Sequence, residues 1–208
     1  MNHLNLGKLL RDARRKLRSG SFDVLADGRI HLQQQGALLG GSFRARYAEP
    51  GCDDFGAPVI SHNRVVGQGL IKLLNLLGGH ASSAPLFIAP FIDNVEPQAN
   101  WTGANFDANA NEFTAYTAAT RLPWTTVPVA SVPTLTNQAA LLAATLTFNA
   151  GGPYTIRGAA LLEASAKEAV TGALIVASRF PDDLTGMMGG GKLALEYSLV
   201  AMDEADAT

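Results

Sequence analysis

The sequence is poor in the residues that most metal, redox and catalytic sites require. Its 208 residues include one cysteine, Cys52, which excludes an internal disulfide and any site built from several cysteines. The four histidines are scattered without the i, i+4 spacing that helical metal ligands need: they are His3, His31, His62 and His80. We therefore expect no metal, no cofactor and no catalytic residue, and predict that the protein is not an enzyme.

Charge and long apolar runs are also scarce. Asp, Glu, Lys and Arg make up 16% of the chain, against about 25% in an average soluble domain, and the net charge of −2 disfavours nucleic acid as a partner. No apolar run reaches the roughly 18 residues of a membrane-spanning helix, and basic residues interrupt the N-terminal segment where a signal peptide is apolar. We expect an intracellular protein that does not bind membranes.

The charge that is present is unevenly placed, because residues 1–20 hold six of the 16 basic residues and one acidic residue, Asp12. Apolar residues recur there at three- and four-residue spacing, which predicts a short basic amphipathic helix over residues 4–18 that ends at Ser19-Gly20. The apolar stripe consists of Leu6, Leu9, Leu10, Ala13 and Leu17, and the basic residues are Lys8, Arg11, Arg14, Arg15, Lys16 and Arg18.

This basic helix has two interpretations. As a docking arm, it would bury its leucines on an acidic protein surface, with the basic side chains adding screened electrostatic contacts; nucleic acid is the competing partner. As a peripheral helix, it would only present a solvated basic face, and it could also be a partly ordered terminus. The stripe has no Trp or Phe to anchor it in a membrane.

Residues 21–58 look extended and irregular, with Gly and Pro breaking the pattern, although Ser42–Tyr47 alternates as a strand does. We expect this segment to be an arm or linker that crosses the main domain or a neighbouring subunit. The folded domain is predicted to span residues 59–201, and residues 202–208 are predicted to form a flexible acidic tail.

The main domain is predicted to be an antiparallel β-sandwich or jelly roll with one short helix. The helix is indicated by an apolar stripe from Val65 to Leu77, with Gly78-Gly79 as its C-terminal stop. Strand-like runs follow without helices between them, and turn clusters such as Pro181–Asp183 separate them. The runs are Leu86–Ile92, Phe113–Thr117, Ala140–Phe148, Tyr154–Glu163, Ala173–Phe180 and Lys192–Ala201.

Aromatic residues gather in the Asn-, Ala- and Thr-rich segment 98–126. They could form a contact surface for sugars, or they could pin a long connection onto the sandwich or fill a groove between subunits. The candidate contact residues are Trp101, Phe106, Tyr116 and Trp124.

Several short motifs occur in an order that resembles a family of tailed-bacteriophage virion proteins. The first is Ile60–Gly79 followed by Pro85–Phe91. The others are Glu112–Tyr116, Arg121–Trp124, Asn137–Ala139, Leu146–Asn149, Ile156–Ala159, Ser165–Lys167 and Gly172–Phe180. The resemblance covers residues 59–201, about two-thirds of the chain. It implies a small β-sandwich structural component of the capsid or tail, without catalytic residues to transfer.

The leading hypothesis is therefore a structural virion protein made in the host bacterial cytoplasm. A capsid decoration or cement protein would contact the major capsid protein through its arms and form a homo-oligomer or lattice. The alternatives are a tail or head–tail junction protein that contacts tail proteins, and a carbohydrate- or receptor-binding module that uses the aromatic segment. A glycosidase would need two carboxylates flanking a cleft, which the sequence does not suggest.

Overall fold

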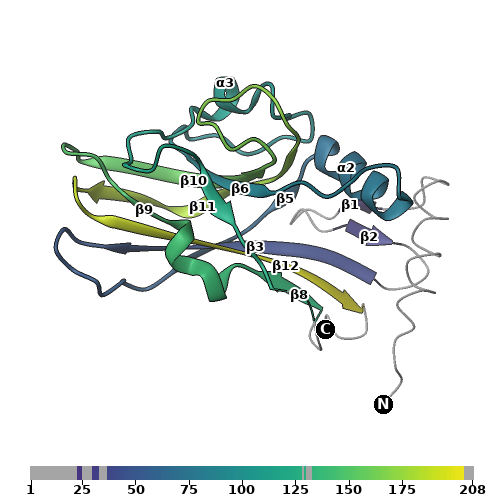
Figure 1. Cartoon of the computed structure of the whole chain (residues 1–208), viewed down its shortest axis with the longest axis horizontal. Coiled ribbons are helices and arrows are strands. Elements are labelled where there is room, and N and C mark those ends of the chain that lie inside the picture. The colour runs from purple at the N-terminus through teal and green to yellow at the C-terminus, as the bar shows by residue number, and fades with distance from the viewer. Residues whose placement is uncertain (1–22, 25–29, 33–36, 128, 130–132, 204–208) are drawn as a thin grey trace, which may run out of the picture.

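The computed structural model describes residues 23–24, 30–32, 37–127, 129 and 133–203. Two antiparallel β-sheets pack face to face over a common apolar core, which confirms the predicted mainly β sandwich (Figure 1). The predicted arm helix at residues 1–20 and the tail residues 204–208 lie outside the described residues.

The first sheet is built around two long strands, β3 (Ala37–Ala48) and β12 (Lys192–Asp203), which pair along their whole lengths. On the β3 side lie β2 (Ile30–Leu32), β1 (Asp23–Val24) and β4 (Val59–His62); on the β12 side lie β8 (Thr134–Thr136) and β9 (Thr145–Thr147). The second sheet has the order β5 (Arg64–Val65), β11 (Leu174–Met187), β10 (Tyr154–Leu162), β6 (Leu86–Phe91) and β7 (Leu122–Trp124).

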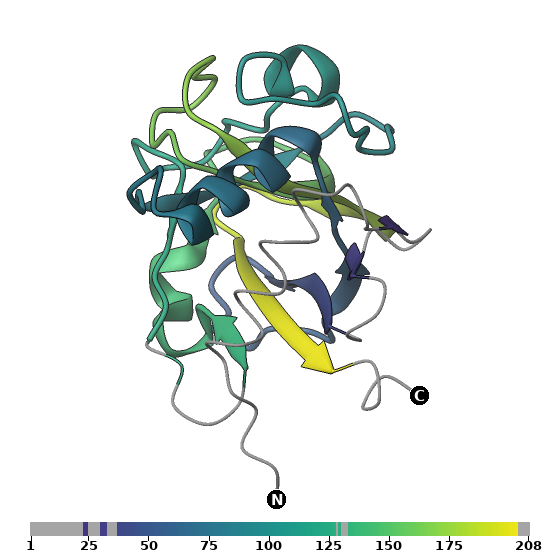
Figure 2. The same ribbon diagram turned by 90° about the vertical axis from the view of Figure 1, so that its right-hand side faces the viewer.

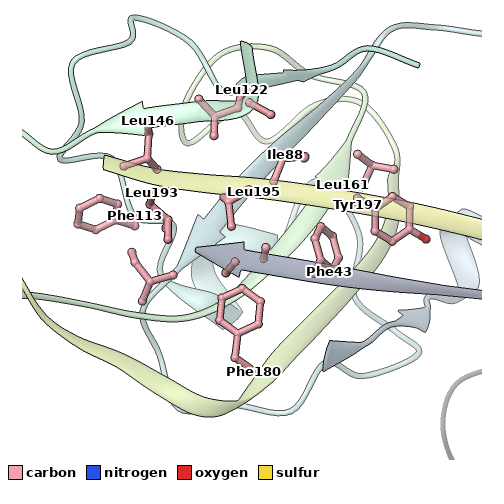
Figure 3. Packing of buried hydrophobic residues seen from close by; sticks show 14 of the residues in the cluster. Phe43, Ile88, Phe113, Leu122, Leu146, Leu161, Phe180, Leu193, Leu195 and Tyr197 are labelled. Carbon is pink, nitrogen blue, oxygen red and sulfur yellow. The ribbon is translucent and has the colours of Figure 1, made fainter. Parts of the chain in front are cut away.

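Strand alternation places the large apolar side chains between the sheets. In β12, Leu193, Leu195 and Tyr197 are buried, and the ring centroid of Tyr197 lies 4.6 Å from that of Phe43 in β3. Ile88 of β6 enters the same core from the second sheet (Figure 3). The predicted alternation of β12 is therefore confirmed on its core-facing side.

The structure corrects the predicted start of the domain at residue 59. β3 belongs to the segment 21–58 that we assigned to an arm, yet Phe43 and Ala45 are fully buried and the strand pairs with both β12 and β4. Residues 37–48 are thus part of the sandwich, because their inward side chains complete its core. At the other end, Met202 and Asp203, assigned to the flexible tail, still pair with β3.

The predicted helix is confirmed as α2 (Gly67–Gly78). It ends at Gly79, whose φ of 72° is the left-handed conformation that glycine adopts most easily. Gly69 lies directly on β11, since a Cβ at this position would fall 2.0 Å from the Ile175 carbonyl oxygen. α2 therefore packs backbone against backbone at one end of the second sheet (Figure 1).

Three of the predicted strands and turns differ from the structure. The run at 140–148 begins in the 3₁₀ helix η1 (Gln138–Ala144), so only β9 is a strand. Segment 113–117 makes an isolated bridge from Tyr116 to Phe148 instead of a strand. The predicted turn Pro181–Asp183 is a bulge within β11, because Arg179 pairs with Gly158 and Leu184 with Ile156.

A buried amide side chain replaces backbone pairing between β8 and β9. Asn137 is fully buried; its Oδ1 accepts from the Tyr197 N–H at 2.8 Å and its Nδ2 donates to the Leu195 carbonyl at 3.1 Å. Trp124 Nε1 donates to the Tyr197 carbonyl at 3.0 Å. These side chains provide hydrogen-bond partners for the backbone groups of β12 between β8 and β9, where no neighbouring strand reaches them.

We expect Asn137→Ala to lower the free energy of unfolding by about 2–4 kcal/mol, because it leaves a buried N–H and a buried carbonyl without partners. Urea denaturation measures the change. Gln138→Ala, at the exposed neighbouring position, is the matched control and should change stability by no more than about 0.5 kcal/mol. Equal losses in the two variants would contradict this role for Asn137.

Candidate functional site

A groove of about 240 Å³ lies where α2, the α2–β6 loop and the end of β7 meet. Its walls are mostly apolar side chains: Leu73, Leu76, Pro85, Leu86, Trp124 and Ile175. Ligand pockets for small molecules usually measure about 300–1,000 Å³. The groove is therefore better suited to a few apolar side chains of a protein segment than to an enclosed substrate.

One ion pair lies on the rim of this groove. Lys72 Nζ is 2.7 Å from Glu163 Oε1, and Glu163 Oε2 accepts a hydrogen bond from the Ala173 N–H at 3.1 Å. Lys72 is the only charged residue of α2. The pair neutralises that charge and links the middle of the helix to the end of β10.

The side of α2 that faces away from the sandwich carries one apolar and one polar exposed residue, Ile71 and Asn75. Ile71 is 63% exposed, while Leu74 and Leu77 are half-buried. We call the apolar residues of the helix and the groove the α2 surface: Ile71, Leu73, Leu74, Leu76 and Leu77 with Pro85 and Trp124. Exposed Asn75 and the Lys72–Glu163 pair lie among them. Contiguous exposed apolar patches of this kind mark interaction sites on soluble proteins.

The predicted aromatic contact surface is contradicted for three of its four residues. Trp101 and Phe106 are buried on the outer side of the second sheet, edge-on to Phe91 at 6.3 and 6.2 Å between ring centroids. Tyr116 is buried in the core beside Phe113. These rings pin the long connection between β6 and β7 onto the sandwich; only Trp124 reaches a groove, and it is half-buried.

A buried ion pair between Glu112 and Arg121 holds that same connection. Arg121 is fully buried; its Nε donates to Glu112 Oε1 at 2.9 Å and its Nη2 to Oε2 at 2.6 Å. Arg121 Nη1 also donates to the Ala164 carbonyl at 3.1 Å, and the Glu168 N–H donates to Glu112 at 2.9 Å. The pair thus fastens the β6–β7 connection to the β10–β11 loop.

Lys167 strengthens this attachment from the loop side. Its Nζ donates to the carbonyls of Thr114 and Tyr116 at 3.0 and 2.9 Å and lies 3.6 Å from the centroid of the Tyr116 ring. Burial lowers the pKa of Lys167 and raises the pKa of Tyr116. The contacts of Glu112, Arg121 and Lys167 hold the β6–β7 connection against the β10–β11 loop, so this cluster has a structural role.

The remaining polar candidates do not gather into a site. His62 and His80 are exposed on separate parts of the chain, as is Cys52. Within the described residues, no three His, Cys, Asp or Glu side chains lie together as a metal ion would require. The helices of this same part of the chain are all too short or too polar to cross a membrane.

The arm residues predicted to bind a partner lie outside the described part of the chain. The structure therefore leaves their role as a prediction. The set comprises Leu6, Lys8, Leu9, Leu10, Arg11, Arg14, Arg15, Leu17 and Arg18.

Comparisons with protein-family models, curated proteins and solved structures find no match to this chain. The resemblance to bacteriophage virion proteins therefore stays a prediction.

Sequence reasoning missed the residues that organise this region. Arg121 carries the single charge between Glu112 and Arg157, and an isolated charge in so long a neutral stretch was a readable signal of a buried pair. Lys72 and Glu163 gave no such signal, because their pairing depends on how α2 lies on the sheet.

We expect Arg121→Met to lower the free energy of unfolding by about 3–5 kcal/mol, because Glu112 would stay buried without its partner. Glu112→Gln should cost a comparable amount, and the double variant should cost clearly less than the sum of the two. Chemical denaturation of all three variants measures this coupling. Lys72→Met, which breaks the more exposed pair, should cost far less; additive effects at Glu112 and Arg121 would contradict the pairing.

Proposed function

We propose that this chain is a structural component of a tailed-bacteriophage virion and acts as a capsid decoration or cement protein. Its partners would be the major capsid protein and further copies of itself. The resemblance of residues 59–201 to a family of virion proteins and the β-sandwich fold support this proposal together.

The observation that carries the proposal is how the fold uses the polar residues of the family-like motifs. Glu112, Arg121 and Lys167 fasten loops to one another, and Asn137 and Trp124 complete the edge of β12. Apart from Trp124, which also lines the groove, these polar side chains are used in contacts within the chain. Their use in contacts between segments of the same chain fits a structural component that contributes shape and rigidity.

The composition supports attachment to a repeating surface. The chain has few charges, and the arm carries a net positive charge of five opposite a body with a net charge of −7. Electrostatic contacts between such an arm and a particle are individually weak. A particle offers many equivalent sites, however, so multivalent attachment prolongs the time the protein stays bound. A position on the tail would use the same features, and imaging of particles distinguishes the two positions.

The first test is to locate the protein in purified particles by mass spectrometry and to place its density by electron microscopy. We expect copies on the capsid surface at positions that repeat with the lattice. Density at the tail would replace the capsid assignment, and absence of the protein from particles would contradict the proposal as a whole.

A second test concerns the arm. We expect Leu9→Ala with Leu10→Ala to reduce occupancy on particles more than Arg14→Ala with Arg15→Ala, because buried leucines contribute more than screened surface charges. Occupancy is measured by quantitative mass spectrometry after washing at increasing salt. A larger effect of the arginine pair, with steep salt dependence, would indicate nucleic acid as the partner. Unchanged occupancy in both variants would show that the arm has no part in attachment.

A further inference from the structure

The α2 surface is unusual for the outside of a sandwich. α2 has the sequence GQGLIKLLNLLG, and only Gly69 among its residues is fully buried. Gln68 and Gly69 fix the helix to the sheet: Gln68 Oε1 accepts from the Leu174 N–H at 2.9 Å and from the Gly103 N–H at 2.8 Å. The helix is therefore held rigidly while most of its leucines are covered only in part.

The groove beside the helix continues this apolar surface. Trp124 and Pro85 also line the groove, and its rim carries no free charge from α2 because Lys72 is paired with Glu163. The surface is thus a neutral, mainly apolar track along a 12-residue helix, with exposed Asn75 as a polar interruption. At 1.5 Å per residue, that track is about 18 Å long, which matches the length of another short helix.

The chain itself contains a segment of complementary character. Residues 4–18 carry the stripe of Leu6, Leu9, Leu10, Ala13 and Leu17, which gathers on one face of a helix. On a helical projection at 100° per residue, Lys8, Arg11, Arg15 and Arg18 point to the opposite face. A helix this short is marginal alone in water and needs an apolar surface to be stable.

The described chain that follows this segment begins at the end of the molecule where α2 lies. Twenty-two residues precede β1, which begins at Asp23. β1 and β2 lie at the end of the sandwich where α2 lies, as the two views agree (Figure 1, Figure 2). A tethered segment also has a high effective concentration at a neighbouring site, which favours its own chain over a second copy.

We infer that the α2 surface is the docking site for residues 4–18 of the same chain. The leucine stripe lies along α2 and the groove, and the basic face points outward beside α2. This inference goes beyond the proposed function, because it concerns the free protein.

Disulfide trapping in the full chain tests this docking. In a Cys52→Ser background, Ile71→Cys is combined in turn with Leu6→Cys, Leu10→Cys or Leu17→Cys, since a disulfide forms only where the Cα atoms come within about 7 Å. Two controls are matched to it. Arg11→Cys with Ile71→Cys tests the basic face, and Leu10→Cys with Asp182→Cys tests the exposed bulge of β11, at the end of the strand away from α2.

We expect at least one leucine position to link to Ile71→Cys within a single chain under mild oxidation, at several times the yield of either control. Non-reducing gels and mass spectrometry of linked peptides show the product. Yields equal to the controls would overturn the inference, as would stronger linking from Arg11→Cys. Disulfide-linked dimers as the main product would show that the segment comes from a second copy, and would overturn the same-chain assignment.

Tryptophan quenching gives a second readout that needs no cysteine. The chain has two tryptophans; Trp101 is 4% exposed, so added acrylamide reports mainly on Trp124 in the groove. We expect Leu9→Ala with Leu10→Ala to increase quenching in the full-length protein, because the docked segment no longer covers the groove. Arg14→Ala with Arg15→Ala should leave quenching unchanged. No increase in the leucine variant would overturn the inference.

Discussion

The buried Glu112–Arg121 ion pair is the contact on which the irregular half of this structure depends. The connection between β6 and β7 and the loop between β10 and β11 contain little regular secondary structure, so their backbone groups cannot satisfy one another in ladders. Arg121 and Glu112 supply those partners through two mutual hydrogen bonds and contacts to the loop backbone. Such a pair is costly to bury, but it specifies one arrangement of both segments.

The same principle operates elsewhere in the sandwich. Asn137 completes the edge of β12, and Gln68 accepts two backbone N–H groups where α2 meets the second sheet. In each case a side-chain amide pairs with backbone groups that no neighbouring strand reaches. These amide side chains hold the chain's own backbone in place.

Periodic parts of the fold could be predicted from the sequence, whereas contacts between distant residues could not. β12 and α2 show clear two-residue and helical periods, and the structure has both. β3 was misassigned because glycines interrupt its pattern; Gly41 is needed since a Cβ there would lie 2.3 Å from the Tyr197 hydroxyl oxygen. Of the candidate site, the stripe of α2 was visible in the sequence, but the groove depends on Trp124, whose position is fixed by tertiary structure.

Residue-resolved hydrogen exchange of the free protein tests most directly whether the ion pair fixes both irregular segments. Two amides report on it: the Arg121 N–H, which donates to the Ser165 carbonyl at 2.8 Å, and the Glu168 N–H, which donates to Glu112. If the pair holds these segments to the sandwich, both amides exchange as slowly as those of β10 and β11. Exchange of both amides at the rate of exposed loops, with β10 and β11 still protected, would contradict the account.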